Sequence, residues 1–75
     1  MTPIFTTELL VGNEPVLYHV VFNDNKYCFE PQNASAGFRS FCLIREHDEW
    51  RAEGVEGPVK EEAIAHLEKY LLAQL

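Results

Sequence analysis

Residues 16–30, VLYHVVFNDNKYCFE, decide the fold of this chain. Two runs rich in β-branched and aromatic residues flank the polar segment 23–25, a pattern typical of two strands joined by a tight turn. Asp24 and Asn25 both tolerate the left-handed backbone conformation that two-residue hairpin turns need. The stretch therefore predicts an antiparallel hairpin with Asp24 and Asn25 at its tip.

The same pattern continues towards the carboxyl terminus. Residues 38–46, FRSFCLIRE, and 49–54, EWRAEG, predict a second hairpin with His47 and Asp48 at its tip. Between the two hairpins, residues 32–37, QNASAG, are small and polar and predict a loop. The middle of the chain thus indicates an antiparallel meander.

Residues 4–11, IFTTELLV, fit two different places in such a fold. They predict either a further strand, turned into the first hairpin at 12–15, or an apolar cover over one face of the sheet. A further strand would make a meander of five strands, whereas a cover would leave four. The sequence leaves this choice open.

The last segment has a different period. Pro58 stands at a favoured first helical position, and Glu61 and Glu62 follow in the first turn, where the helix dipole favours anions. Apolar residues then recur at intervals of three and four and define one helix face: Ile64, Leu67, Leu71 and Leu75. The predicted fold class is α+β, an antiparallel β-meander of four to five strands with one carboxy-terminal α-helix packed on one face, in a single small domain spanning residues 1–75.

Strand register divides the side chains between two faces of the sheet. Hairpin tips at 24–25 and 47–48, with a loop centred on Ser35, agree on one face, and a slip of one residue would scatter it. This face is expected to pack against the helix and comprises Tyr18, Val20, Phe22, Tyr27, Phe29, Phe41, Leu43, Trp50 and Ala52. The opposite face, which we call the second sheet face, is polar at its rim and apolar at its middle, and comprises Leu17, His19, Val21, Cys28, Glu30, Cys42, Ile44 and Arg51.

Composition and charge exclude several classes of function. The chain has 75 residues, 47% of them hydrophobic, and a formal net charge of -6. A negative protein repels phosphate, which disfavours nucleic-acid binding. No apolar run approaches the roughly 20 residues that a membrane span needs, and the amino terminus lacks the positive charge of a signal peptide. We therefore expect a cytoplasmic protein that binds neither nucleic acid nor membrane.

The densest run of titratable residues is IREHDEWR, residues 44–51. Consecutive side chains in it point apart, and the glycine and terminal glutamate of a calcium loop are missing. A solvated hairpin turn is the expectation, with Trp50 buried between sheet and helix. His19, His47 and His66 fall on three differently directed elements, and His66 is expected to face solvent. The sequence thus predicts no metal site and no cofactor.

One group of residues has the parts of nucleophilic catalysis. His19 is expected directly across from Glu30, with the Cys28 thiol as a diagonal neighbour. No glycine-rich loop or helix amino terminus lies nearby to supply an oxyanion hole, so the interpretation is a structural cross-strand pair, with no catalytic residues. Cys28 and Cys42 are expected to oppose each other within disulfide range, although a reducing cytoplasm favours free thiols.

These observations lead to a functional expectation without a biological role. Because one helix covers one sheet face only, the second sheet face is the candidate interaction surface. The leading hypothesis is a non-catalytic protein-interaction module, self-associating as a homodimer through that face. The alternative is an acidic, immunity-type binder or inhibitor of a basic partner, and a remote alternative is a cysteine-dependent enzyme.

Overall fold

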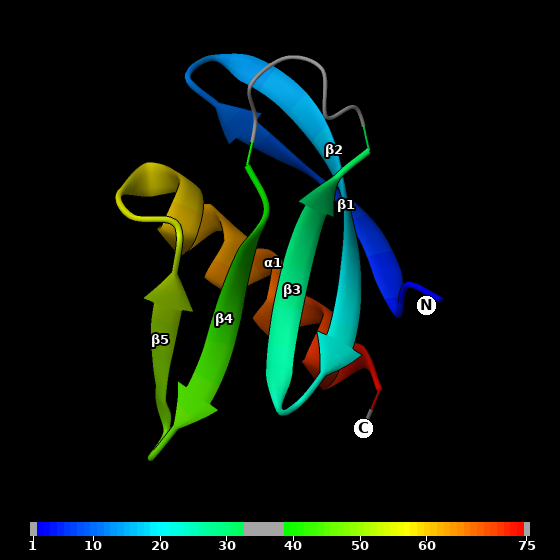
Figure 1. Ribbon diagram of the computed structural model, residues 1–75, viewed down its shortest axis with the longest axis vertical. Coiled ribbons are helices and arrows are strands. Elements are labelled where there is room, and N and C mark those ends of the chain that lie inside the picture. The colour runs from blue at the N-terminus through cyan, green and yellow to red at the C-terminus, as the bar shows by residue number, and fades with distance from the viewer. Residues whose placement is uncertain (1, 33–38, 75) are drawn as a thin grey trace.

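The computed structural model describes residues 2–32 and 39–74. The elements are, in chain order, β1 (Phe5–Val11), β2 (Glu14–Asn23), β3 (Lys26–Pro31), β4 (Phe41–Glu46), β5 (Glu49–Glu53) and α1 (Pro58–Ala73). The strands form one antiparallel sheet in the order β1-β2-β3-β4-β5, and α1 lies across one of its faces (Figure 1). The predicted fold class is confirmed, with five strands.

Three two-residue turns, at 12–13, 24–25 and 47–48, connect the two strands of each hairpin. Both residues of each turn have positive φ, between 49° and 71°. This is the geometry whose twist matches that of paired strands, and Gly, Asn and Asp adopt it most readily. The predicted tips of the second and third turns are therefore confirmed. The first turn is shorter than the predicted 12–15.

Residues 4–11 supply the edge strand and do not cover the second sheet face. β1 pairs with β2 from Phe5 opposite Val20 to Val11 opposite Glu14. Pro15 is tolerated inside β2 because β2 pairs with β3 only from Tyr18 onward, so the missing proline N–H faces no neighbouring strand.

The predicted registers of the other strands are confirmed. Diagnostic opposed pairs are Phe22 with Tyr27, Phe29 with Phe41 and Arg45 with Trp50. β4 begins at Phe41, later than the predicted residue 38, and the loop expected at 32–37 lies outside the described residues except for Gln32.

The core lies between the sheet and α1. Its fully and nearly fully buried side chains are Leu9, Val16, Tyr18, Val20, Phe29, Phe41, Leu43, Ala63 and Leu67. Five of these belong to the face that the registers assigned to the helix. Leu9 and Val16 complete the core because β1 is a strand. On the helix, Ala63 is buried and Ile64 is only partly so, and Leu75 lies outside the described residues.

The helix does not cover the whole of the face that the sequence assigned to it. α1 crosses the sheet obliquely, from the side of β5 to the side of β1 (Figure 1), where Tyr70 stacks on Phe5 with ring centroids 4.3 Å apart. Phe22, at the turn end of β2, stays 46% exposed, and Trp50 is only partly buried. The expectation that Phe22 is covered is wrong, because the helix path leaves this corner of the sheet open. Trp50 does pack against the core and bonds to Glu68 of α1, but it stays partly exposed. No helix within the described ranges is long and apolar enough to cross a bilayer.

Tyr18 gives the core a dependence on alkaline pH. Its side chain is 2% exposed, and burial raises the pKa of its phenol above the ordinary value of 10.0. The unfolded chain loses this proton first, so the stabilisation is complete below about pH 10 and is lost as pH rises further. We expect wild type to lose stability more steeply than Tyr18→Phe between about pH 9 and about pH 11. Urea unfolding followed by circular dichroism at each pH measures both slopes, and parallel slopes would contradict the assignment.

Candidate functional site

The structure places the residues of the second sheet face on the side of the sheet opposite α1, as the registers require. Its apolar middle is less exposed than the sequence suggested. Val21 and Ile44 are each only 8% exposed within the single chain. The apolar surface left to a partner at this centre is therefore small.

Charged side chains provide the cover over this face. Lys26 and Arg51 stand directly opposite Ile44 on the two neighbouring strands. The Lys26 Nζ atom lies 3.2 Å from Glu53 Oε1, and Arg51 Nε lies 3.3 Å from Glu46 Oε1. Exposed ion pairs of this kind contribute little energy, but the aliphatic stems of Lys and Arg shield apolar neighbours from water.

Cys28 and Cys42 are joined in a disulfide, with their Cα atoms 4.0 Å apart. The expectation of free thiols is therefore wrong for this structure, because the register opposes the two residues directly. The group formed by His19, Glu30 and Cys28 consequently has no free thiol. The His19 ring contacts the Thr6 hydroxyl, with Oγ1 3.4 Å from Nδ1.

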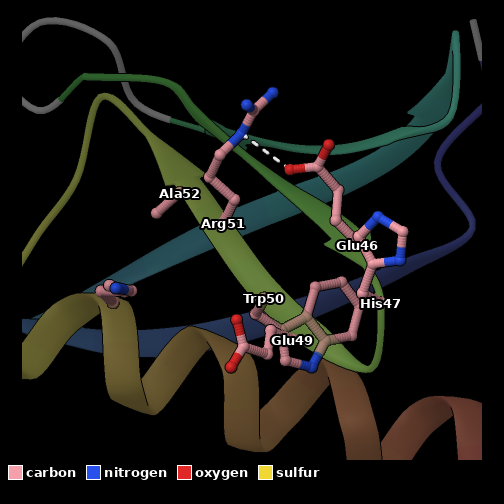
Figure 2. Close-up of a pocket in the computed structure, with 7 residues that line it drawn as sticks. Glu46, His47, Glu49, Trp50, Arg51 and Ala52 are labelled. Atoms are coloured by element: carbon pink, nitrogen blue, oxygen red, sulfur yellow. Dashed lines mark ion pairs between the residues drawn. The ribbon is translucent and has the colours of Figure 1, made fainter.

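The titratable residues of the β4–β5 hairpin line a shallow hollow of about 380 Å³. Figure 2 shows that Arg51 turns towards Glu46, whereas Trp50 turns towards α1. The charged groups therefore do not converge on one point. Across residues 2–32 and 39–74, no group of three or more His, Cys, Asp or Glu side chains is arranged to hold a metal ion.

A contact between β1 and α1 was missed by the sequence reasoning. His66 Nδ1 lies 2.7 Å from Thr7 Oγ1, so the expectation that His66 faces solvent is wrong: this side of α1 lies against β1. On the same helix, Glu62 Oε1 accepts a hydrogen bond of 2.8 Å from the backbone N–H of Leu10 and thereby caps a free amide of the edge strand.

The row of hydroxyl, imidazole and carboxylate resembles the parts of a catalytic triad. However, His66 Nε2 lies 3.9 Å from Glu62 Oε2, which is beyond hydrogen-bond reach. The carboxylate therefore does not orient the imidazole. The arrangement is well suited to fastening the helix to the edge strand.

The strongest candidate site is a continuous aromatic row at the end of the molecule where the two hairpin tips at 24–25 and 47–48 lie (Figure 1). The rings of Phe22 and Tyr27 are 4.7 Å apart between centroids. Tyr27 meets Trp50 edge to face, with centroids 5.9 Å apart. The row thus runs from β2 through β3 to β5 on the helix side of the sheet.

Two charged side chains connect this row to the helix. Arg45 Cζ lies 5.1 Å from the centre of the Trp50 ring, a cation–π arrangement. The Trp50 indole N–H donates to Glu68 Oε2 at 3.2 Å, and Arg45 Nη1 lies 3.5 Å from the same oxygen. The indole is therefore held in a fixed orientation with part of its ring uncovered.

The helix completes the surface with leucines. A shallow groove of about 430 Å³ is lined by Arg45, Glu68, Leu71 and Leu72, and Leu72 is 68% exposed. We call the following set the hairpin-end patch: Phe22, Tyr27, Arg45, Trp50, Leu71 and Leu72. Aromatic residues and Arg are the types enriched in the centres of protein interfaces.

A signal for this patch was present in the sequence. Phe22, Tyr27 and Trp50 all stand within a few residues of a predicted hairpin tip, where a single crossing helix covers the sheet least.

Comparison of the chain with protein-family models, with curated proteins and with solved structures gives no match in any of the three.

Proposed function

We propose that the protein is a non-catalytic protein-interaction module that binds its partner through the hairpin-end patch. The observation that carries the proposal is the exposure at the two ends of the patch, 46% for Phe22 and 68% for Leu72. From Phe22 the contacts run through Tyr27 and Trp50 to Arg45, and Arg45 lines the same groove as Leu72. A partner would bury this surface, and aromatic and Arg anchors of this kind supply most of the energy of many interfaces.

Two further features support a binding role over catalysis. The charged groups around the hollow of Figure 2 do not converge on one point, since Arg51 is paired with Glu46, and the imidazole of His66 is engaged by Thr7. The hollows described at residues 44–52 and beside Leu71 and Leu72 are shallow, whereas enzymes usually enclose their substrates in a deeper cleft.

The test is capture of the partner by the tagged protein from lysate of the source cells, followed by an affinity measurement with the purified partner. Phe22→Ser combined with Leu72→Ser removes apolar surface from the patch without changing net charge. We expect this variant to bind the partner at least about tenfold more weakly than wild type. Leu72→Ser alone, at an exposed helix position, gives the same direction of change with less risk to folding.

The matched control is Leu10→Ser combined with Leu17→Ser, since these leucines are 54% and 39% exposed and lie on the other face of the sheet. The control should bind as wild type does. Equal weakening by both pairs of substitutions would contradict a specific role for the hairpin-end patch.

The second candidate function is self-association through the second sheet face. It is favoured by Leu10 and Leu17, which are diagonal neighbours at one end of that face and remain exposed. Leu17→Glu is the appropriate variant, because Val21 is buried within the chain and a charge there would disturb folding. A dimer of wild type in sedimentation at high micromolar concentration, converted to a monomer by Leu17→Glu, would support this candidate. A wild-type monomer would refute it.

A further inference from the structure

We infer that the hairpin-end patch is shaped for a cationic amphipathic helix, a segment with aliphatic side chains on one face flanked by Lys or Arg. This inference rests on the proposed function and adds the chemistry of the partner. It is carried by the distribution of charge around the patch and by the patch's dimensions.

Three acidic residues lie near the aromatic row. Asp24 lies in the turn that follows Phe22 and precedes Tyr27, and Asp48 lies in the turn between β4 and β5. Glu68 contacts Trp50 directly. Asp48 is fully exposed, and Glu68 is about half exposed. Asp48 and Glu68 share Arg45 between them, and both are exposed enough to contact a basic partner as well.

The bases of the same strands are directed away from this rim. Side chains alternate along a strand, so Lys26 and Arg51 lie on the second sheet face, where they pair with Glu53 and Glu46. Arg45 is the base within the patch, and it is already engaged by Glu68 and Asp48. Lys60 of α1 lines the hollow beside Trp50, but at the hairpin end the carboxylates of Asp24, Asp48 and Glu68 outnumber the single base of the patch, Arg45.

This charge distribution selects against two other occupants. A second copy of the chain placed patch to patch would bring the acidic rims together, and such like-charge contacts are unfavourable. An anionic membrane surface would be repelled for the same reason. The acidic rim would raise the rate at which a basic partner encounters the patch and would favour its correct orientation there.

The dimensions suit a helix. The row from β2 to β5 spans three interstrand spacings of about 4.8 Å each, or roughly 14 Å. An α-helix rises about 1.5 Å per residue, so anchors at positions i, i+4 and i+7 or i+8 cover roughly 11–12 Å. The groove beside Leu71 and Leu72 can receive one such anchor, and the exposed ring of Phe22 can contact another.

Trp50 provides the measurement, because it is the single tryptophan of the chain. A synthetic peptide of about 18 residues, made of Leu and Lys at helical spacing and free of aromatic residues, is titrated into the protein. We expect a saturable change in Trp50 emission that is at least about tenfold weaker in affinity at about 200 mM salt than at about 50 mM salt. A peptide with Glu in place of every Lys should give no saturable change.

Protein variants separate apolar docking from charge attraction. Phe22→Ser with Leu72→Ser keeps the charge and should weaken peptide binding at least about tenfold, whereas Leu10→Ser with Leu17→Ser should leave it unchanged. Asp24→Asn with Asp48→Asn should weaken binding and flatten its salt dependence. Circular dichroism of each variant verifies that it is folded.

Each outcome bears on one part of the inference. Equal binding of the Lys and Glu peptides, or equal binding by the patch variant and its control, overturns the cationic helix as occupant. If partner capture still depends on Phe22 and Leu72 in that case, the patch remains the interface and only the partner's chemistry is wrong. If capture is insensitive to the patch while the peptide binds there, the proposed function fails instead.

Discussion

Replacement of Phe29 by alanine is expected to lower the free energy of unfolding by about 3–5 kcal/mol. Phe29 is fully buried at the centre of the sheet's helix-facing side. Its ring stacks on Phe41 with centroids 4.8 Å apart and meets Tyr18 at 6.4 Å. Removal of the ring loses its burial and leaves a cavity between residues that the backbone holds apart. A domain of this size is expected to have only a few kcal/mol of stability, so the variant should be largely unfolded at room temperature.

Phe22→Ala is the matched control, since the same residue type stands on a neighbouring strand and the same face but is 46% exposed. We expect less than half the loss seen at Phe29. Urea unfolding followed by far-ultraviolet circular dichroism measures both, with the thermal midpoint as a second measure. A Phe29→Ala protein as stable as Phe22→Ala would show that the core is not centred where the structure places it.

The strand registers could be predicted because turn chemistry and side-chain alternation both constrain which residues stand opposite each other on neighbouring strands. Asp24 and Asn25 specify a two-residue turn, and the alternation of apolar residues then admits one pairing. Each hairpin checks the next, so an error at one turn would have put Phe29 or Leu43 on the wrong face. Local rules were sufficient for the registers from β2 to β5, whereas they left open whether residues 4–11 form β1.

The crossing angle of the helix could not be predicted in the same way. The helical period defines which face of the helix is apolar, but not the direction in which the helix crosses the sheet. The exposure of Phe22, the partial burial of Trp50 and the contact of His66 with Thr7 all depend on that direction. The hairpin-end patch as a whole was therefore invisible to reasoning from single elements, although Phe22, Tyr27, Trp50 and Leu71 were named.

The shielding of the second sheet face shows a related limit. Val21 and Ile44 occupy the positions expected. However, alternation along a strand predicts which face a side chain points to, not how much of it the neighbouring side chains cover. The stems of Lys26 and Arg51 stand on the strands either side of Ile44 and supply cover that was expected from residues 4–11 or from a partner. A count of apolar residues on a sheet face thus overestimates the surface available to a partner when long charged side chains stand beside them.

Reduction of the disulfide between Cys28 and Cys42 is expected to lower the free energy of unfolding by about 3 kcal/mol, on the chain-entropy model for a loop of this size. The two residues are separated by 14 positions. The bond joins β3 to β4, whose register extends only from Lys26 opposite Ile44 to Phe29 opposite Phe41. The other strand neighbours are connected by two-residue turns, whereas β3 and β4 are joined by the long segment between Pro31 and Phe41. The bond therefore acts where the sheet has its greatest loop-closure cost.

The measurement compares urea unfolding with and without a reducing agent, with thiol titration to verify reduction. The control is Cys28→Ala combined with Cys42→Ala, whose stability should resemble that of the reduced protein and should not respond to the reductant. A wild-type protein whose thiols titrate fully but whose stability is unchanged would contradict the expected role of the bond.

The size of this effect matters because the expected cytoplasmic location and the disulfide favour different redox states. Disulfides persist in oxidising compartments and are mostly reduced in the cytoplasm. A loss of about 3 kcal/mol is comparable with the whole stability expected of so small a domain. The reduced chain must then rely on the core around Phe29, or on a partner bound at the hairpin-end patch, since any ligand that binds only the folded state stabilises it. If the reduced protein is marginally stable alone, addition of the cationic peptide should raise its unfolding midpoint, and the patch variant with Phe22→Ser and Leu72→Ser should lose that response.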